Sequence, residues 1–381
     1  MGGCSGPVTV AIASRLALGG LVLALGLVGC DPGPPATSPS TGTAAGAARA
    51  TASPAPAGGS PAGSADASSI AGPDPASALA DRSAAAGGAR AISRRETPNG
   101  FGVGPGAVYY CDGILHAAPK TGGAERELGA CTAAFDFQAG PRGVYFCDRR
   151  GLRLLPPDGP AQLVAADRGC ILEAVDAGGA YYVVPGFKGV ARPGLYRLAG
   201  SGGAPRRILA TRRGEQLSIA LDGDAIWIGH WKAGIISRMR RTGGPAIAVV
   251  RGQRGVVDVA VDDESIYWYA EGTGEIRRRG KRGGPIEVIG RDVDQEPIEV
   301  HRGHAYWFEG GPGKPRRLVH LAPGASRAEP LVDGLQVPIL RIDDEGIYYA
   351  EFLRPGIFAL PPPPWTSPPP SQPATSARPA P

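Results

Sequence analysis

The sequence contains little of what α-helices are made from. It has only 2 Met, and long stretches of Ala, Leu, Glu and Lys are few. Gly and Pro, which disfavour helix interiors, supply 59 and 39 of the 381 residues. This composition excludes a helical bundle or coiled coil and argues against a doubly wound enzyme. What is present is 43% hydrophobic residues with 5 Trp, 11 Tyr and 8 Phe, too many for a chain that is disordered throughout.

Signatures of catalysis and nucleotide binding are also absent. The sequence has no Gly-x-Ser-x-Gly elbow, phosphate loop, dinucleotide fingerprint or His-Glu-x-x-His motif. Its net charge of +5 is too balanced for a nucleic-acid partner. We therefore predict no catalytic residue, cofactor, metal or nucleic-acid partner. We also expect a monomer. A catalytic site assembled from distant parts of the chain would leave no such motif.

The N-terminal residues are typical of an export signal. Leu16–Leu27 is an uncharged apolar run after Arg15, as in signal peptides. It is shorter than the roughly 20 residues of a permanent membrane span. The sequence Leu27-Val28-Gly29-Cys30 resembles the bacterial lipoprotein box, whose Cys is diacylated. We predict a signal peptide over 1–29, lipidation of Cys30, and a lipoprotein anchored to a membrane of the bacterial cell envelope. A cleaved secretory signal and an uncleaved anchor are the alternatives.

Two segments have compositions that cannot form a core. Residues 30–90 are mostly Ala, Pro, Ser and Gly, with only Ile70 and Leu79 as large apolar side chains. Such a segment buries too little surface to offset the entropy of ordering it. Residues 361–381 hold 10 Pro in 21 positions, which favours an extended polyproline chain. We predict a disordered tether at 30–90 and a Pro-rich disordered tail at 361–381.

The segment between them, residues 91–360, repeats. Each unit is marked by an aromatic doublet preceded by a small or β-branched residue, although in unit four the second member is Ile. The first members are Tyr109, Tyr145, Tyr181, Trp227, Tyr267, Tyr306 and Tyr348. They are 36 to 46 residues apart, a period typical of propellers and solenoids.

Each unit is predicted to hold four short strands. In the fifth unit, alternation and turn residues place the strands at 257–261, 266–269, from 275 onward, and at 286–289. A Gly-Gly turn precedes the last strand and recurs in three other units. Four-stranded units repeated around a ring form a β-propeller. We therefore predict an all-β fold, a single propeller of seven four-stranded blades over 91–360, with six blades or separate sandwich domains as alternatives.

The ring is predicted to close by strand exchange. The seventh unit supplies three strands and then runs into prolines, which cannot pair as a central strand. Residues 90–95 are the only strand-like material between tether and repeats. We expect this N-terminal stretch to complete the last blade.

The repeats resemble a known class of propeller. Ile266-Tyr267-Trp268 and the later Gly-Gly-x-Pro turns resemble the YWTD-type propellers of low-density lipoprotein receptors, and more closely bacterial TolB-like propeller repeats of unknown function. The Asp that closes the YWTD motif is matched at Asp112 and Asp148, whereas units four to seven lack it. The resemblance implies a propeller, with six blades in the YWTD class.

Four cysteines fall within the repeats. They are Cys111, Cys131, Cys147 and Cys170. An exported chain meets an oxidising compartment in which disulfides persist. Cys111 and Cys147 occupy one repeat position, and Cys131 and Cys170 both open the next unit. We predict the pairs Cys111–Cys131 and Cys147–Cys170. Pairing of Cys131 with Cys147 is the alternative. A metal site is a third interpretation, which is disfavoured because no Cys-x-x-Cys is present.

The other chemically notable residues fit positions of the repeat. The histidines are His116, His230, His301, His304 and His320. His301-x-x-His304 is interpreted as part of a turn rather than as a metal site, and His116 and His320 as third-strand residues. The acid pairs Asp262-Asp263 and Asp343-Asp344 recur at one turn and are assigned to turn formation.

Basic pairs and runs are spread over the repeats. They are Arg206-Arg207, Arg212-Arg213, Arg240-Arg241, Arg277–Arg279 with Lys281-Arg282, and Arg316-Arg317. We predict that they lie in third strands and the turns that follow, where charge protects outer edges from pairing with other chains. A stripe that binds anionic polymers or phospholipid headgroups is the alternative.

These observations predict a non-catalytic binding or scaffold module for a protein or polysaccharide, held at the envelope by Cys30. An envelope glycosidase or lyase of propeller fold is the first alternative. A structural component of an envelope complex is the second.

Overall fold

The structure is a computed structural model of the chain. It describes residues 89–95, 100–132, 134–186, 190, 192–293, 297–311, 314–335, 338–351 and 354–360. No helix in this part of the chain is long and apolar enough to cross a membrane. The signal peptide at 1–29, Cys30, nearly all of the tether and the tail at 361–381 lie outside the described residues.

All 28 elements are β-strands. They are β1 (Arg90–Ser93), β2 (Phe101–Gly104), β3 (Ala107–Cys111), β4 (Ile114–Pro119), β5 (Arg126–Ala130), β6 (Phe135–Gly140), β7 (Gly143–Asp148), β8 (Gly151–Leu155), β9 (Gln162–Ala165), β10 (Ile171–Asp176), β11 (Gly179–Val184), β12 (Gly194–Ala199), β13 (Arg206–Ala210), β14 (Leu217–Asp222), β15 (Ala225–His230), β16 (Ile235–Arg240), β17 (Ile247–Val250), β18 (Val256–Val261), β19 (Ser265–Ala270), β20 (Glu275–Gly280), β21 (Glu287–Gly290), β22 (Glu299–His301), β23 (His304–Glu309), β24 (Arg316–Leu321), β25 (Glu329–Leu335), β26 (Pro338–Asp343), β27 (Gly346–Glu351) and β28 (Arg354–Leu360).

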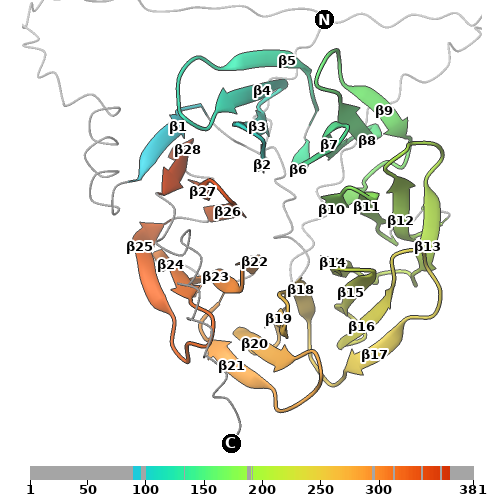
Figure 1. Cartoon of the computed structure of the whole chain (residues 1–381), viewed down its shortest axis with the longest axis vertical. Helices are drawn as coiled ribbons and strands as arrows, with labels where there is room; N and C mark the ends of the chain where they lie inside the picture. The colour runs from blue at the N-terminus through green and yellow to red at the C-terminus, as the bar shows by residue number, and fades with distance from the viewer. Residues whose placement is uncertain are drawn as a thin grey trace, which may run out of the picture.

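The strands form seven antiparallel sheets of four, arranged as blades around a ring (Figure 1). Blade 1 is β2–β5, and blades 2 to 6 follow in chain order up to β25. The first strand of each blade lies at the centre of the ring and the fourth at its rim. The seven-bladed propeller expected from the doublets is confirmed, and the six-bladed alternative is wrong.

Blade 7 contains both ends of the propeller. Its sheet order is β1-β28-β27-β26, and Arg90 of β1 pairs with Ala359 of β28. The predicted strand exchange is therefore confirmed. Ile92 of β1 is 5% exposed and packs in a cluster with residues of blade 1, so the N-terminal strand contributes to the core as well as to the sheet.

The core consists of seven apolar clusters, one between each pair of neighbouring blades. Side chains alternate between the two faces of a strand, so the two doublet residues pack into different clusters. In β19, Tyr267 packs toward blade 6 and Trp268 toward blade 4. The doublets recur because each blade must bury a large side chain on both faces, at about 3 kcal/mol for each ring.

The antiparallel order assigns every turn to one of two faces. Turns between first and second strands, and between third and fourth strands, lie on one face, which we call the acidic-turn face because it carries Asp176, Asp222, Asp262 and Asp343. Second-to-third turns and the connections between blades lie on the other, which we call the disulfide face. β1 starts and β28 ends on the acidic-turn face, so both chain ends leave the ring there.

Two turn types on the acidic-turn face explain the glycine pattern. In the third-to-fourth turn of blade 4, Gly243 and Gly244 have φ of 94° and 117°, which only glycine adopts at low cost. In blade 6, Arg302 and Gly303 have φ of 51° and 79° between paired His301 and His304, as in a tight hairpin turn.

Candidate functional site

A cavity of about 440 Å³ lies at the centre of the ring and is lined by the first strands of all seven blades. Its polar side chains include Gln138 of β6, Glu173 of β10, Asp258 of β18, Glu299 of β22 and Arg341 of β26. The cavity is where a propeller can combine residues from different blades. It is therefore the first place to look for a dispersed catalytic site.

Two of the buried carboxylates in this cavity bind backbone N–H groups of the following blade. Glu173 Oε2 accepts the N–H of Ile219 at 3.2 Å, and Asp258 Oδ2 accepts the N–H of Ile298 at 3.0 Å. Both side chains belong to residues less than 10% exposed. A buried charge is tolerated when hydrogen bonds replace its hydration. Each carboxylate thus holds two blades together.

Two further carboxylates at the cavity join blades through Arg341. Its guanidinium contacts Asp136 of β6 and, at 3.4 Å, Glu299 Oε1. Asp136 lies at an irregularity of the β6–β7 pairing and has a φ of 39°. A bulge of this kind redirects a side chain, and here it turns the carboxylate toward blade 7. Gln138 Nε2 donates to the Glu173 carbonyl at 3.0 Å, which links blades 2 and 3.

None of these channel residues belongs to a recognisable motif in the sequence. The signal that marks them is a charged side chain inside an otherwise apolar first strand, as in Ile339-Leu340-Arg341-Ile342. Alternation alone gave no reason to place those charges together, because the ring joins residues far apart in sequence, such as Arg341 and Asp136, which are 205 positions apart.

The cysteines form the expected pairs on the disulfide face. Cys111 is bonded to Cys131 with Cα atoms 6.2 Å apart, and Cys147 to Cys170 with Cα atoms 5.8 Å apart. Cys131 and Cys170 lie just before the first strands rather than inside them. The two bonds sit in the clusters between blades 1 and 2 and between blades 2 and 3.

The histidines do not converge on the channel. His116 of β4 is fully buried, stacks on Tyr110 and lies 3.0 Å from Asp112 through Nε2. His230 Nε2 lies 2.8 Å from the Ser237 hydroxyl, and burial lowers its pKa.

The other three histidines lie in blade 6. His301 Nε2 lies 3.0 Å from Asp344 Oδ1, and His304 Nδ1 lies 2.6 Å from His320 Nε2. Burial, together with the charges of His320 and His301, lowers the pKa of His304 to about 4. Within the described residues no group of three or more His, Cys, Asp or Glu could hold a metal ion.

The basic runs are less uniform than expected. Arg240-Arg241, Arg277–Arg279 and Arg316-Arg317 lie in third strands or the turns after them, as predicted. Arg206-Arg207 instead opens β13, a fourth strand, because the Gly202-Gly203 turn precedes it. Arg212-Arg213 follows β13 in the connection to blade 4, so both placements were wrong.

The acid pairs form turns, as predicted, and on the acidic-turn face Asp343 and two single acids, Asp222 and Asp176, also bind basic residues of the next blade. Asp343 Oδ1 accepts the N–H groups of Glu345 and Gly346, while Oδ2 faces Lys120 of blade 1. Asp222 Oδ2 lies 2.7 Å from Lys281 Nζ of blade 5. Burial raises the pKa of Asp222, but Lys281 and Trp227 lower it more, so that the net shift is downward. Asp176 and Arg241 make the corresponding pair between blades 3 and 4.

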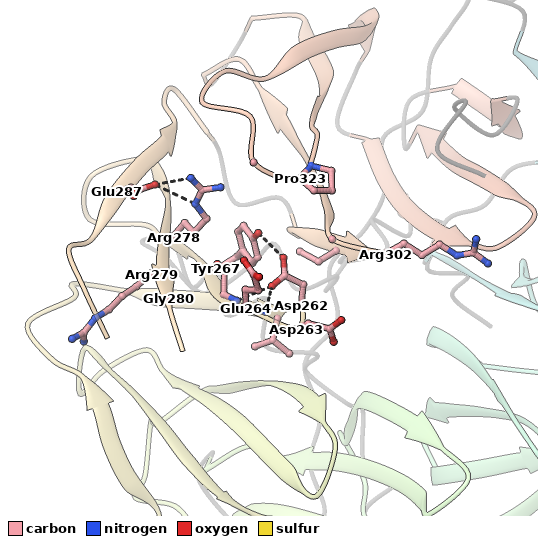
Figure 2. A pocket seen from close by; sticks show the side chains of 15 residues that line it. Asp262, Asp263, Glu264, Tyr267, Arg278, Arg279, Gly280, Glu287, Arg302 and Pro323 are labelled. Atoms are coloured by element: carbon pink, nitrogen blue, oxygen red, sulfur yellow. Dashed lines mark hydrogen bonds and ion pairs between the residues drawn. The ribbon is translucent and has the colours of Figure 1, made fainter. Parts of the chain in front are cut away.

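A second cavity, of about 630 Å³, opens between blades 5 and 6 on the acidic-turn face (Figure 2). Asp262 lies in its wall, and its Oδ2 accepts a hydrogen bond from the Tyr267 hydroxyl, with the two oxygens 2.7 Å apart. Burial and the bond to Asp262 raise the pKa of Tyr267 to about 12. Asp263 and Glu264 add exposed carboxylates, and Pro323 closes the opposite side.

Comparison with known proteins places the chain among propellers. No protein-family model and no curated protein sequence matches it. A streptogramin B lyase structure is similar with a TM-score of 0.56 and 14% identity, over 71% of this chain and 96% of that one. A catalytically inactive variant of virginiamycin B lyase from Staphylococcus aureus, solved with quinupristin, gives 0.53 and 16% identity over 71% and 99%.

A puromycin-hydrolyzing peptidase of Mycobacterium tuberculosis is also similar, with a TM-score of 0.50 and 15% identity over 65% of this chain and 49% of that one. At these identities the similarity shows the propeller fold alone. The neighbours differ in chemistry, as their names state, so the fold does not select an activity.

Proposed function

We propose that this protein is a lipid-anchored, non-catalytic binding module of a bacterial cell envelope, which presents one face of its propeller to a protein or polysaccharide. The observation that carries the proposal is that the channel carboxylates are bonded to groups of other blades. Glu173 and Asp258 accept backbone N–H groups of the next blade, and Arg341 contacts Asp136 and Glu299.

A glycosidase needs two carboxyl groups that face the substrate, one of them able to give up a proton. In Glu173 and Asp258 a carboxylate oxygen already accepts a backbone N–H group of the next blade, which fixes its position. They are suited to holding blades at a fixed spacing rather than to transferring protons. The channel therefore supports a rigid ring with its ligand surface elsewhere.

The acidic-turn face offers such a surface. It carries the 630 Å³ cavity between blades 5 and 6, which is larger than the channel cavity of 440 Å³. The proposed anchor fits this arrangement because β1 begins on the same face. Two acyl chains on Cys30 would anchor stably, and a flexible tether of about 60 residues would hold the ring on the order of 45 Å from the membrane.

An envelope glycosidase or lyase of propeller fold is the alternative. It would require a substrate that displaces the inter-blade bonds of the channel. A structural component of an envelope complex is the third hypothesis, and it predicts a stoichiometric partner that stays bound through purification.

The proposal is tested by affinity capture of the protein from its own membrane fraction, beside a Cys30→Ala variant. We expect the parent to sediment with membranes and retain a partner or glycan, and the variant to move to the soluble fraction. Turnover of a glycan panel together with recovery of no partner would overturn the binding function. Retention of the variant in the membrane would overturn lipidation.

A further inference from the structure

One position of the repeat decides how neighbouring blades are joined on the acidic-turn face. It is the residue directly after the third-strand position that lies opposite the start of the second strand, and it faces the acid at, or just after, the end of the first strand of the preceding blade. Lys120, Arg241 and Lys281 occupy this position and contact Asp343, Asp176 and Asp222. Three seams between blades are thus closed by a cation of the chain itself.

Two other seams lack both partners. Between blades 1 and 2 the acid position is Gly104 and the cation position is Pro157. Between blades 2 and 3 they are Gly140 and Gly200. Acid and cation are therefore present together or absent together at these five seams. This pattern is expected if each half-buried carboxylate needs a cation.

The seam between blades 5 and 6 breaks the pattern. Its acid is present as Asp262, but the cation position of blade 6 is Pro323. The register is fixed by the strand pairing, in which Ala305 lies opposite Leu321 as Ile226 lies opposite Met239, and by the turn bond that spans the cation position. Ala325 N–H donates to Ala322 O, as Gly243 N–H donates to Arg240 O in blade 4. Pro323 is therefore the counterpart of Arg241.

The second cavity lies where the missing cation would be. Pro323 and Asp262 face one another across it, and the labelled guanidinium groups of Arg279 and Arg302 point away from Asp262 (Figure 2). Arg279 donates to the carbonyls of Gly284 and Val249, and Arg302 is 2.7 Å from Asp344 of blade 7. The third arginine of the lining, Arg278, is 2.6 Å from Glu287 of its own blade. Each of the three guanidinium groups therefore has a partner other than Asp262.

The Asp262 carboxylate has the same arrangement as its occupied counterpart in blade 4. Asp222 Oδ2 accepts Trp227 Nε1–H at 3.0 Å and Lys281 Nζ at 2.7 Å. Asp262 Oδ2 accepts the Tyr267 hydroxyl in the place of the Trp227 group. A carboxylate oxygen has two acceptor directions, so Asp262 Oδ2 can take a second donor from the seam as Asp222 does.

We propose that the cavity between blades 5 and 6 binds a lysine or arginine side chain of a polypeptide partner, which takes the place that Lys281 fills one seam earlier. This inference rests on the proposed binding function and names its recognition chemistry. A side chain is favoured over a free amine because every cation that fills the equivalent place in the ring is a Lys or Arg side chain. Asp263 and Glu264 add negative charge that favours a cationic ligand.

The test is a calorimetric titration of the full chain with the peptide acetyl-Gly-Lys-Gly-amide and with its norleucine counterpart. We expect the lysine peptide to bind weakly, with a Kd on the order of 1 mM, and the norleucine peptide at least tenfold more weakly. The variant Pro323→Lys, which supplies the missing cation from the chain, should lower the affinity for the lysine peptide at least tenfold. Pro323→Met, of similar size but uncharged, should retain most of it.

Equal affinity for the two peptides, or full binding by Pro323→Lys, would overturn the inference. Binding of 1-aminopentane as tight as that of the lysine peptide would overturn the polypeptide assignment. In membrane capture, a partner retained equally by Pro323→Lys and the parent would contradict the cavity as its site while the binding function stands. Recovery of no partner by the parent, with turnover of the glycan panel, would instead contradict the binding function.

Discussion

The seam between blades 7 and 1 and the seam between blades 5 and 6 use the same repeat positions in opposite ways. At the first, Lys120 is 4% exposed and contacts both Asp343 and Glu345. Arg90 of β1 donates to the Lys120 carbonyl from the strand that closes the ring. At the second, Asp262 faces a cavity and Pro323.

The difference follows from a single side chain. Where the repeat supplies a Lys or Arg, the carboxylate of the preceding blade is neutralised and the seam closes. Where it supplies Pro323, the same carboxylate lines an open cavity. Replacing one Lys or Arg of a repeat by Pro can therefore turn a closed seam into the proposed ligand site, without a change of fold.

Removing β1 should have the largest effect on the closed seam. Deletion of residues 90–95 removes the outer strand of blade 7 and the buried Ile92 side chain. We expect a loss of about 5 kcal/mol, or about 10–20 °C in Tm for a domain of this size. Differential scanning calorimetry measures it. A deletion of residues 80–85 from the tether is the control, and an equal Tm for the two deletions would refute closure by β1.

Substitution at the cation position should lower the free energy of unfolding more at the closed seam than at the open one. Lys120→Met leaves Asp343 and Glu345 without their partner and should cost about 2 kcal/mol. Pro323→Met at the open seam removes no ion pair and should cost less than about 1 kcal/mol, from the flexibility gained without proline. Urea unfolding gives both values. Equal losses would show that Lys120 contributes nothing specific to its seam.

Acid should weaken blade 6, which borders the open seam. The pKa of His304 is about 4 in the folded protein, below the unfolded value of about 6.5. The unfolded chain then binds more protons between these values, so stability falls as pH drops from about 6.5 toward 4. We expect a smaller fall of Tm between pH 7 and 5 in His304→Gln than in the parent. Parallel Tm curves for the two proteins would contradict this.

Much of the ring could be predicted from local patterns. The aromatic doublets and Gly-Gly turns predicted the seven blades, because each reflects a requirement inside one blade. The missing fourth strand of the last unit predicted that β1 completes its sheet. The cysteine pairs followed from repeat positions in the same way.

The candidate sites could not be predicted so directly. The bond between Arg341 and Asp136 joins residues of blades 7 and 2, far apart in sequence, and depends on the bulge in β6. Recognising the open seam requires comparing Asp262 with the residue that faces it from the next blade. Its cation position in blade 6 lies inside the turn Ala322–Ala325, which has Ala-Pro-Gly-Ala in place of the Gly-Gly motif. The repeat register there came only from the paired strands and the turn bond.

The central claim is that position 323 lies within reach of the Asp262 carboxylate, as position 281 lies within reach of Asp222. A double-mutant cycle in urea unfolding tests it directly, using Pro323→Lys and Pro323→Met, each with and without Asp262→Asn. Asn retains the turn-forming side chain and removes the charge. We predict that Lys at 323 stabilises the protein by about 1 kcal/mol more with Asp262 than with Asn at that position. A coupling of zero would contradict the account.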